Sequence, residues 1–163
     1  NKDLTDITAC LLDRPRHKKI IDKLKDLNVK IKLITDGDVL GAIYVSEPKY
    51  NVDMYLGIGG GPEGVLAASA LDTFGCYFQG RFIFDNEENI NEAKKMGIVD
   101  LNKKYLLDEL IKGDSIFCAT GITQSNVLSG IMNKKNNITS ETLVTHKSSN
   151  LKKIVKKTIT LNK

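Results

Sequence analysis

The sequence lacks the features that mark several large protein classes. It has only 3 Cys in 163 residues and no unbroken apolar run of about 18 residues, so it predicts neither a disulfide framework nor a membrane span. The cysteines, Cys10, Cys76 and Cys118, lie far apart, as is typical of reduced thiols in a cytosolic compartment. We therefore expect a cytoplasmic protein without a membrane partner.

Several catalytic motifs are also missing. The chain contains no Walker A lysine motif, no CxxC pair, no HExxH and no G-x-S-x-G, so the enzyme classes marked by these motifs are not indicated. Positive charge is concentrated in residues 133–163, which hold eight Lys against one acidic residue, Glu141. That segment has neither Arg nor an aromatic residue, so we interpret it as a solvated lysine-rich face and expect no nucleic-acid partner.

Strand and helix patterns alternate along most of the chain. Short apolar segments at 7–13, 29–35 and 52–58 are typical of strands, and residues 16–28 carry apolar residues at helical spacing. Pro62 predicts the first turn of a helix after a glycine-rich loop. Farther along, the patterns predict strands at 76–84, 114–121 and in the C-terminal third, and helices at 88–97 and 106–113.

This alternation favours an α/β fold, with residues 1–163 forming one layered domain and a mainly parallel or mixed sheet flanked by helices. Ligands of such sheets bind at the carboxyl ends of the strands. Four predicted strand ends carry suitable groups: residues 13–17 (DRPRH), 35–38 (TDGD), 57–64 (GIGGGPEG) and 118–123 (CATGIT). We expect these segments to share a common position in the sheet.

Arg14 and Arg16 flank Pro15, a residue typical of the first turn of a helix. Two guanidinium groups there are disfavoured by roughly 0.3 to 1 kcal/mol each, unless an anion lies between them and the free N–H groups. The segment therefore favours a bound phosphate, with solvated arginines or pairing to Asp13 as the alternative. The neighbouring His17 is more typical of a surface residue than of a base.

Asp36 and Asp38 lie on either side of Gly37 at the end of an apolar segment. Carboxylates spaced in this way can accept hydrogen bonds from sugar hydroxyls or bind a hard cation. A plain turn is an equally good interpretation, because Asp and Gly are favoured in turns.

The glycine-rich loop is also compatible with a different function, dinucleotide binding. Gly59, Gly61 and Gly64 satisfy G-x-G-x-x-G between a predicted strand and a helix. Asp85 follows about twenty residues later, where a dinucleotide-binding fold has its ribose-binding acid. An NAD-binding Rossmann-like module that uses the Gly59–Gly64 loop is therefore the alternative function.

Pro62 and Glu63 argue against a dinucleotide. Pro62 removes a backbone donor, and Glu63 adds negative charge where a pyrophosphate would bind. A carboxylate and a phosphate a few ångströms apart repel by roughly 4 kcal/mol at an effective dielectric constant of about 20, unless a cation lies between them. Magnesium or manganese suits such oxygen ligands. The alternative is that Glu63 only balances the helix dipole.

Read in order, five segments resemble the class II fructose-1,6-bisphosphatase family of lithium-sensitive, metal-dependent sugar phosphatases: LLDRPRH, ITDGDV, MYLGIGGGPEGVLAASAL, KKMGI and GDSIFCATGIT. The similarity covers roughly residues 5–130. It implies a sugar-phosphatase-like fold and metal-dependent hydrolysis of the 1-phosphate of fructose 1,6-bisphosphate to fructose 6-phosphate and phosphate. The pathways implied are gluconeogenesis or carbon fixation, with a link to glycerol metabolism.

The resemblance also implies roles for individual residues. Substrate contacts fall on Arg14, Pro15, Arg16, Asp36, Gly37, Asp38 and Gly60. The arginine stretch corresponds to phosphate contacts, the aspartate stretch to the sugar-binding part, and Glu63 to a ligand of magnesium or manganese. The chain is then similar to a C-terminal portion of a longer, homo-oligomeric phosphatase, whose catalytic residues and other metal ligands lie in the preceding half.

Overall fold

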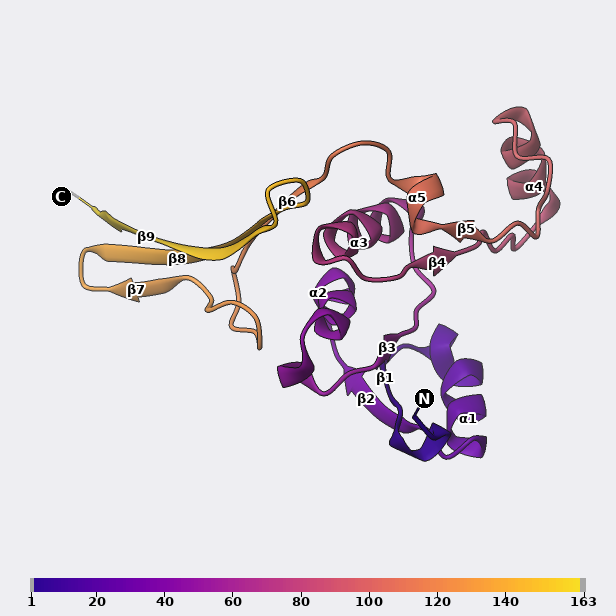
Figure 1. The fold of residues 1–163 in the computed structure, drawn as a ribbon, viewed down its shortest axis with the longest axis horizontal. Helices are drawn as coiled ribbons and strands as arrows, with labels where there is room; N and C mark the ends of the chain where they lie inside the picture. The colour runs from indigo at the N-terminus through magenta and orange to yellow at the C-terminus, as the bar shows by residue number, and fades with distance from the viewer. Residues whose placement is uncertain (1, 162–163) are drawn as a thin grey trace.

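The computed structural model describes residues 2–161, in which helices cover a small parallel sheet (Figure 1). The sheet has the order β2-β1-β3 and consists of β1 (Thr8–Leu12), β2 (Lys30–Ile34) and β3 (Met54–Tyr55). The central strand β1 is buried along most of its length, in agreement with its continuous apolar sequence. Parallel strands need a crossover connection, and α1 (Lys18–Asp26) provides it between β1 and β2.

The core of this part of the fold lies on both faces of β1. Leu11 packs with Ile21 and Leu24 of α1 on one face. Cys10 packs with Tyr44 on the other face, and burial raises the pKa of the Cys10 thiol. Because side chains alternate along a strand, one short apolar segment supplies the core on both sides.

Two helices follow the second and third strands. α2 (Asp38–Ile43) begins directly after Gly37, whose φ of 80° is in the left-handed region. α3 (Gly61–Phe74) has Pro62 in its first turn, as predicted, and ends at Gly75 with a φ of 70°. The two helices pack against each other, with Ala42 of α2 against Ala67 and Leu71 of α3.

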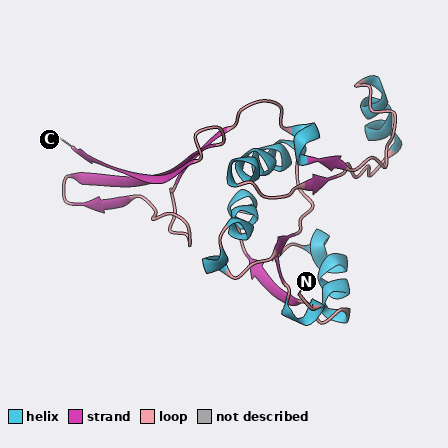
Figure 2. Cartoon of the chain, viewed as in Figure 1, coloured by secondary structure: helices cyan, strands magenta, loops and turns pink. Residues whose placement is uncertain are grey.

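The segment after α3 leaves the parallel sheet (Figure 2). β4 (Gln79–Gly80) and β5 (Tyr105–Leu106) form an antiparallel pair, and α4 (Glu87–Lys95) lies between them in the sequence. The short helix α5 (Leu107–Leu110) follows. The strand predicted over 76–84 is confirmed only at β4, because the aromatic rings beyond it pack on one another instead of alternating across a sheet.

The C-terminal third forms a four-stranded antiparallel sheet. It consists of β6 (Ile116–Thr120), β7 (Met132–Lys134), β8 (Asn137–His146) and β9 (Leu151–Thr160), with β8 paired to the other three. The β8–β9 hairpin extends away from the helices (Figure 1). The α/β prediction is thus confirmed, with the parallel and antiparallel strands in separate sheets.

The antiparallel sheet is attached to the rest of the chain through α3. Phe117 and Leu143 pack with Ala70 of that helix. Thr73 also donates a hydrogen bond to the Thr145 hydroxyl at 2.7 Å, and both side chains are buried. None of the helices within residues 2–161 combines the length and the apolar character needed to cross a membrane.

Candidate functional site at the carboxyl edge of the parallel sheet

Three of the four strand-end segments meet at one edge of the parallel sheet. Adjacent strands β2, β1 and β3 run in the same direction, so the loops at 35–38, 13–17 and 56–60 all begin at their carboxyl ends. The fourth segment, residues 118–123, is not part of this edge, and the expectation of one common position was wrong in this respect. Its strand, β6, pairs with β8 in the antiparallel sheet.

The first loop carries Arg14 and Arg16. Arg14 directly precedes the 3-10 turn Pro15–His17, and Arg16 lies within it. Arg16 Nε donates a hydrogen bond to the Ile58 carbonyl at 2.5 Å, and Arg14 Nη1 donates to the Asp13 carbonyl at 2.9 Å. Within residues 2–161 neither guanidinium forms an ion pair, so the alternative of an Arg pairing with the Asp13 carboxylate is not observed. The remaining N–H donors are available to an anion.

His17, at the end of the same turn, is completely buried. Its Nδ1 lies 2.8 Å from the Leu12 carbonyl, and its Nε2 accepts a hydrogen bond from the Ile58 N–H at 2.8 Å. The interpretation of His17 as a surface residue was therefore wrong. Hydropathy gives no signal for this burial, because a polar ring between charged neighbours is typical of a surface; its position at a strand end was the only available hint.

The second loop holds the two aspartates in a tight turn. Asp36 Oδ1 accepts the Gly37 N–H at 2.8 Å, and Asp38 Oδ1 accepts the Val39 N–H at 2.8 Å. These contacts agree with the interpretation of the segment as a plain turn. They use only the Oδ1 atom of each carboxylate, so Oδ2 is left for other partners. Asp38 Oδ2 lies 4.0 Å from the point where a Cβ on Gly59 would be, so this loop reaches the glycine loop.

The third loop brings Glu63 over the main chain of Gly60. Glu63 lies in the first turn of α3 and is exposed, and a Cβ built on Gly60 would overlap its Oε2. A residue without a side chain is therefore needed at position 60 if the carboxylate is to keep this place. In the described part of the chain, the Glu63 carboxylate accepts no hydrogen bond from another side chain or from the main chain outside its helix, so its oxygens can bind a ligand.

Metal binding requires more ligands than this edge supplies. Among residues 2–161, no three His, Cys, Asp or Glu side chains come together in a way that could hold an ion. The exposed carboxylate of Glu63 fits as one oxygen ligand of a hard cation such as magnesium or manganese. Waters, substrate oxygens or further protein groups would complete the coordination.

Tyr55, at the end of β3, is a site residue that sequence reasoning missed. Its ring lies below the glycine loop, with Cε1 3.3 Å from a Cβ position on Gly57. Burial, and then the Asp38 carboxylate, raise the pKa of Tyr55 to about 12, while Arg16 acts in the opposite direction. Tyr55 is therefore a neutral side chain that lies near groups from all three loops. The apolar strand pattern around it gave no indication of this role.

The fold does not have the arrangement that the dinucleotide alternative requires. In a Rossmann fold the strand after the glycine-loop helix returns to the parallel sheet, and its end places the acidic residue at the ribose. Here β4 follows α3 and pairs antiparallel with β5, outside that sheet. Asp85 lies in the exposed loop before α4, away from any parallel strand end.

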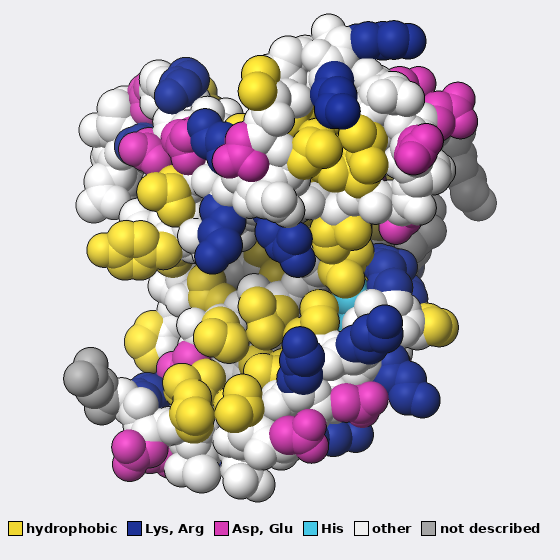
Figure 3. All heavy atoms as spheres, turned by 90° about the vertical axis from the view of Figure 1, so that its right-hand side faces the viewer, with side chains coloured by type: hydrophobic (Ala, Val, Ile, Leu, Met, Phe, Trp, Pro, Cys, Tyr) yellow, Lys and Arg dark blue, Asp and Glu magenta, His cyan; other side chains and the backbone are white. Residues whose placement is uncertain are grey.

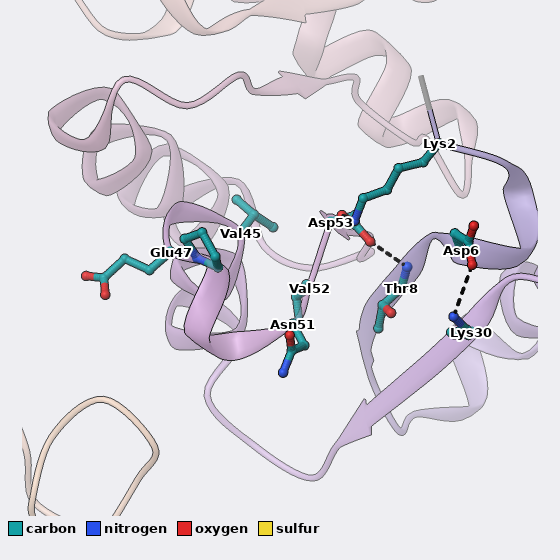
Figure 4. Close-up of a pocket in the computed structure, with 10 residues that line it drawn as sticks. Lys2, Asp6, Thr8, Lys30, Val45, Glu47, Asn51, Val52 and Asp53 are labelled. Carbon is teal, nitrogen blue, oxygen red and sulfur yellow. Dashed lines mark hydrogen bonds and ion pairs between the residues drawn. The ribbon is translucent and has the colours of Figure 1, made fainter.

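A pocket lies at the opposite, amino-terminal edge of the parallel sheet (Figure 4). Its lining includes Thr8 and Lys30, the first residues of β1 and β2. Asp53 accepts the Thr8 N–H at 2.8 Å, and Lys30 pairs with Asp6 at 3.5 Å. These contacts hold the starts of the strands together, and none of the predicted site residues lines this pocket.

The fold and the site define a parallel α/β protein whose strand ends combine arginines, carboxylates and a glycine loop at a helix start. This combination is suited to a phosphorylated, hydroxyl-bearing ligand. Comparison with known proteins then gives the family. A family model described as "Bacterial fructose-1,6-bisphosphatase, glpX-encoded" matches residues 1–159, and the chain belongs to this family, as the resemblance implied.

Similar proteins of known name agree with this assignment. The chain is 38% identical over 167 positions to "Fructose-1,6-bisphosphatase class 2" of Haemophilus influenzae, which covers 94% of this chain and 50% of the relative. It is 33% identical over 157 residues to "D-fructose 1,6-bisphosphatase class 2/sedoheptulose 1,7-bisphosphatase" of Trichodesmium erythraeum, covering 88% of this chain and 46% of that protein. The chain therefore spans about half the length of these relatives.

Proposed function

We propose that the protein acts in the metal-dependent hydrolysis of the 1-phosphate of fructose 1,6-bisphosphate, giving fructose 6-phosphate and phosphate. Family membership supports the reaction class. One structural observation supports the assignment of this chain to substrate and metal binding: the loops of three adjacent parallel strands bring together arginines, aspartates and the glycine loop with Glu63. The proposed metabolic setting is gluconeogenesis or carbon fixation in the cytoplasm.

The proposed roles follow from the chemistry of each loop. Arg14 and Arg16, with Pro15 fixing the turn between them, bind a phosphate group through guanidinium N–H donors. Asp36 and Asp38, held by the turn at Gly37, accept hydrogen bonds from sugar hydroxyls with the oxygens that the turn leaves unused. The main chain at Gly60 contacts the substrate beside the Glu63 carboxylate, since Gly60 has no side chain of its own.

Glu63 is the proposed metal ligand on this chain. Its carboxylate is exposed beside Gly60, so a cation bound there would lie next to the phosphate-binding groups. Magnesium or manganese, when bound, supplies polarisation of the phosphoryl group and a more acidic water. Catalytic groups and the remaining metal ligands are expected in the part of the relatives that this chain does not match.

We further propose that the chain is the C-terminal portion of a longer, homo-oligomeric phosphatase. Large apolar side chains that are strongly exposed support this, among them Tyr77 at 100%, Val99 at 91% and Met96 at 80%. Figure 3 shows apolar side chains gathered in a hollow across one face, bordered by Lys and Arg. Surfaces of this kind are suited to packing against further protein.

The test is phosphate release from fructose 1,6-bisphosphate by the intact protein with magnesium or manganese. Glu63→Gln should reduce the rate at least 100-fold, because the neutral amide is a poor ligand for a hard cation. Glu87→Gln is the matched control, since Glu87 is also an exposed carboxylate in the first turn of a helix but lies in α4. Activity that needs no divalent metal, or that is equal in both variants, would contradict the proposal.

A further inference from the structure

His17 joins two of the three loops that form the site. It is the last residue of the turn that follows β1 and has no exposed surface. One ring nitrogen, Nδ1, lies 2.8 Å from the carbonyl of Leu12, the last residue of β1. The other, Nε2, lies 2.8 Å from the main-chain nitrogen of Ile58, which belongs to the loop after β3. The ring therefore spans the first and third loops.

The partners of the ring specify one tautomer. An Ile58 N–H can only donate, so Nε2 must carry the lone pair. The proton is then on Nδ1, where it donates to the Leu12 carbonyl. Nε2 is also 3.1 Å from the Ile58 carbonyl, but a proton on Nε2 would leave the Ile58 N–H without its acceptor, and in the neutral ring it would also leave the Leu12 carbonyl against a lone pair. Only the Nδ1–H form satisfies both main-chain groups.

Ile58 is the point at which the glycine loop is attached. His17 binds its N–H, and Arg16 Nε donates to its carbonyl at 2.5 Å. Glycines at 57, 59, 60 and 61 surround it, and they have no side chains that could pack the loop into place. The position of Gly60 and of the Glu63 carboxylate above it therefore depends on how the Ile58 main chain is held.

We propose that His17 is a positioning residue, which in its neutral Nδ1–H form sets the separation between the arginine turn and the glycine loop. It is buried and acts through the Ile58 main chain, so it makes no contact with a ligand. Its effect on catalysis rests on the proposed function, whereas its tautomer and its bond to Ile58 do not. Those two properties can be measured in the protein without substrate or metal.

Two substitutions separate the two contacts of the ring. In His17→Gln, the amide oxygen can reach the place of Nε2 and accept the Ile58 N–H. In His17→Asn, the shorter amide can replace only the Nδ1 contact to Leu12. We expect hydrogen exchange at the Ile58 amide to be slow in the wild type, nearly as slow in the Gln variant, and at least tenfold faster in the Asn variant. His146→Asn is the control, since His146 lies at the end of β8.

¹⁵N NMR of the imidazole nitrogens in the intact protein gives the tautomer directly. The His17 signals are assigned as those that disappear in both His17 variants. A proton on Nε2, or equal Ile58 exchange in the wild type and the three variants, would overturn the proposal.

A second experiment concerns the hydrolysis itself. The value of kcat/KM should fall about tenfold in the Asn variant and stay close to the wild-type value in the Gln variant. If the amide results hold while the wild type releases no phosphate from fructose 1,6-bisphosphate, the proposed function fails and the role of His17 stands. Faster Ile58 exchange in the Asn variant without a fall in its kcat/KM would overturn the catalytic consequence.

Discussion

Gly41, in the middle of α2, allows the contact between that helix and the parallel sheet to be tested. A Cβ at this position would lie 2.6 Å from Ile34 Cδ1 and 2.7 Å from Tyr55 Cε2. Both distances are shorter than van der Waals contact, so Gly41→Ala must displace Ile34, Tyr55 or the helix. Overpacking of this kind destabilises by about 1–3 kcal/mol, and the better helix propensity of Ala offsets about 1 kcal/mol of that. We expect a net loss of up to about 2 kcal/mol in the free energy of unfolding.

Gly64 provides the matched control, because it is also a helical glycine but a Cβ there would meet no atom within 4 Å. Gly64→Ala should stabilise the protein by up to about 1 kcal/mol through helix propensity alone. Urea unfolding measures both variants, with the midpoint shifting in opposite directions and the slope unchanged. The reasoning is refuted if Gly41→Ala is as stable as Gly64→Ala. The added methyl group would then have the same effect at position 41, where it meets Ile34 and Tyr55, as at position 64, where it meets no atom.

Three further predictions concern ionisation and the extent of the chain. Hydrogen bonds from Ser148 and His146 lower the pKa of Asp114 from 3.8 to about 2, so its contribution to stability is full above about pH 4 and is lost as the pH falls to about 2. Asp114→Asn should therefore lower the melting temperature at pH 7 but not near pH 2, and a constant difference would contradict this. Tyr55 has its pKa raised from 10.0 to about 12, so wild-type stability should fall more steeply than that of Tyr55→Phe between about pH 10 and pH 12. Parallel melting curves across that range would show that Tyr55 titrates normally. The 163-residue chain alone should hydrolyse fructose 1,6-bisphosphate far more slowly than the intact protein, and a similar kcat for both would show that no group outside it is needed.

Local sequence patterns predicted the helices whose formation depends mainly on neighbouring residues. Helical spacing of apolar residues indicated α1, and Pro62 with the glycines before it indicated the start of α3. The division into three sheets was not predictable in this way, because β6, for example, pairs with residues of β8 that lie more than twenty positions later. Strand pairing depends on such distant contacts, whereas hydropathy reports only the nearest neighbours.

The candidate site was also predictable only in part, for the same reason. The residue types at three strand ends suggested phosphate, sugar and cation binding, and the parallel order of those strands brings the three loops together. The burial of His17 and the place of Tyr55 were missed, because each depends on a contact with a distant segment, the loop at Ile58 for His17 and α2 at Gly41 for Tyr55. The roles of the arginines, the aspartates and Glu63 stay predictions that the variants above can test.

The parallel sheet and the C-terminal antiparallel sheet also differ in the order in which they can form. The β8–β9 hairpin pairs His146 with Leu151 across a short turn, so it can close on a timescale of about 1–10 μs. The parallel sheet instead joins Cys10 to Tyr55, and this contact closes a much longer segment of chain, which makes it slower to form. The carboxyl edge is complete only when β3 docks beside β1. The arginine turn after β1 therefore meets the glycine loop only once this long-range contact has formed, and a chain that has formed its C-terminal hairpin need not yet have a site.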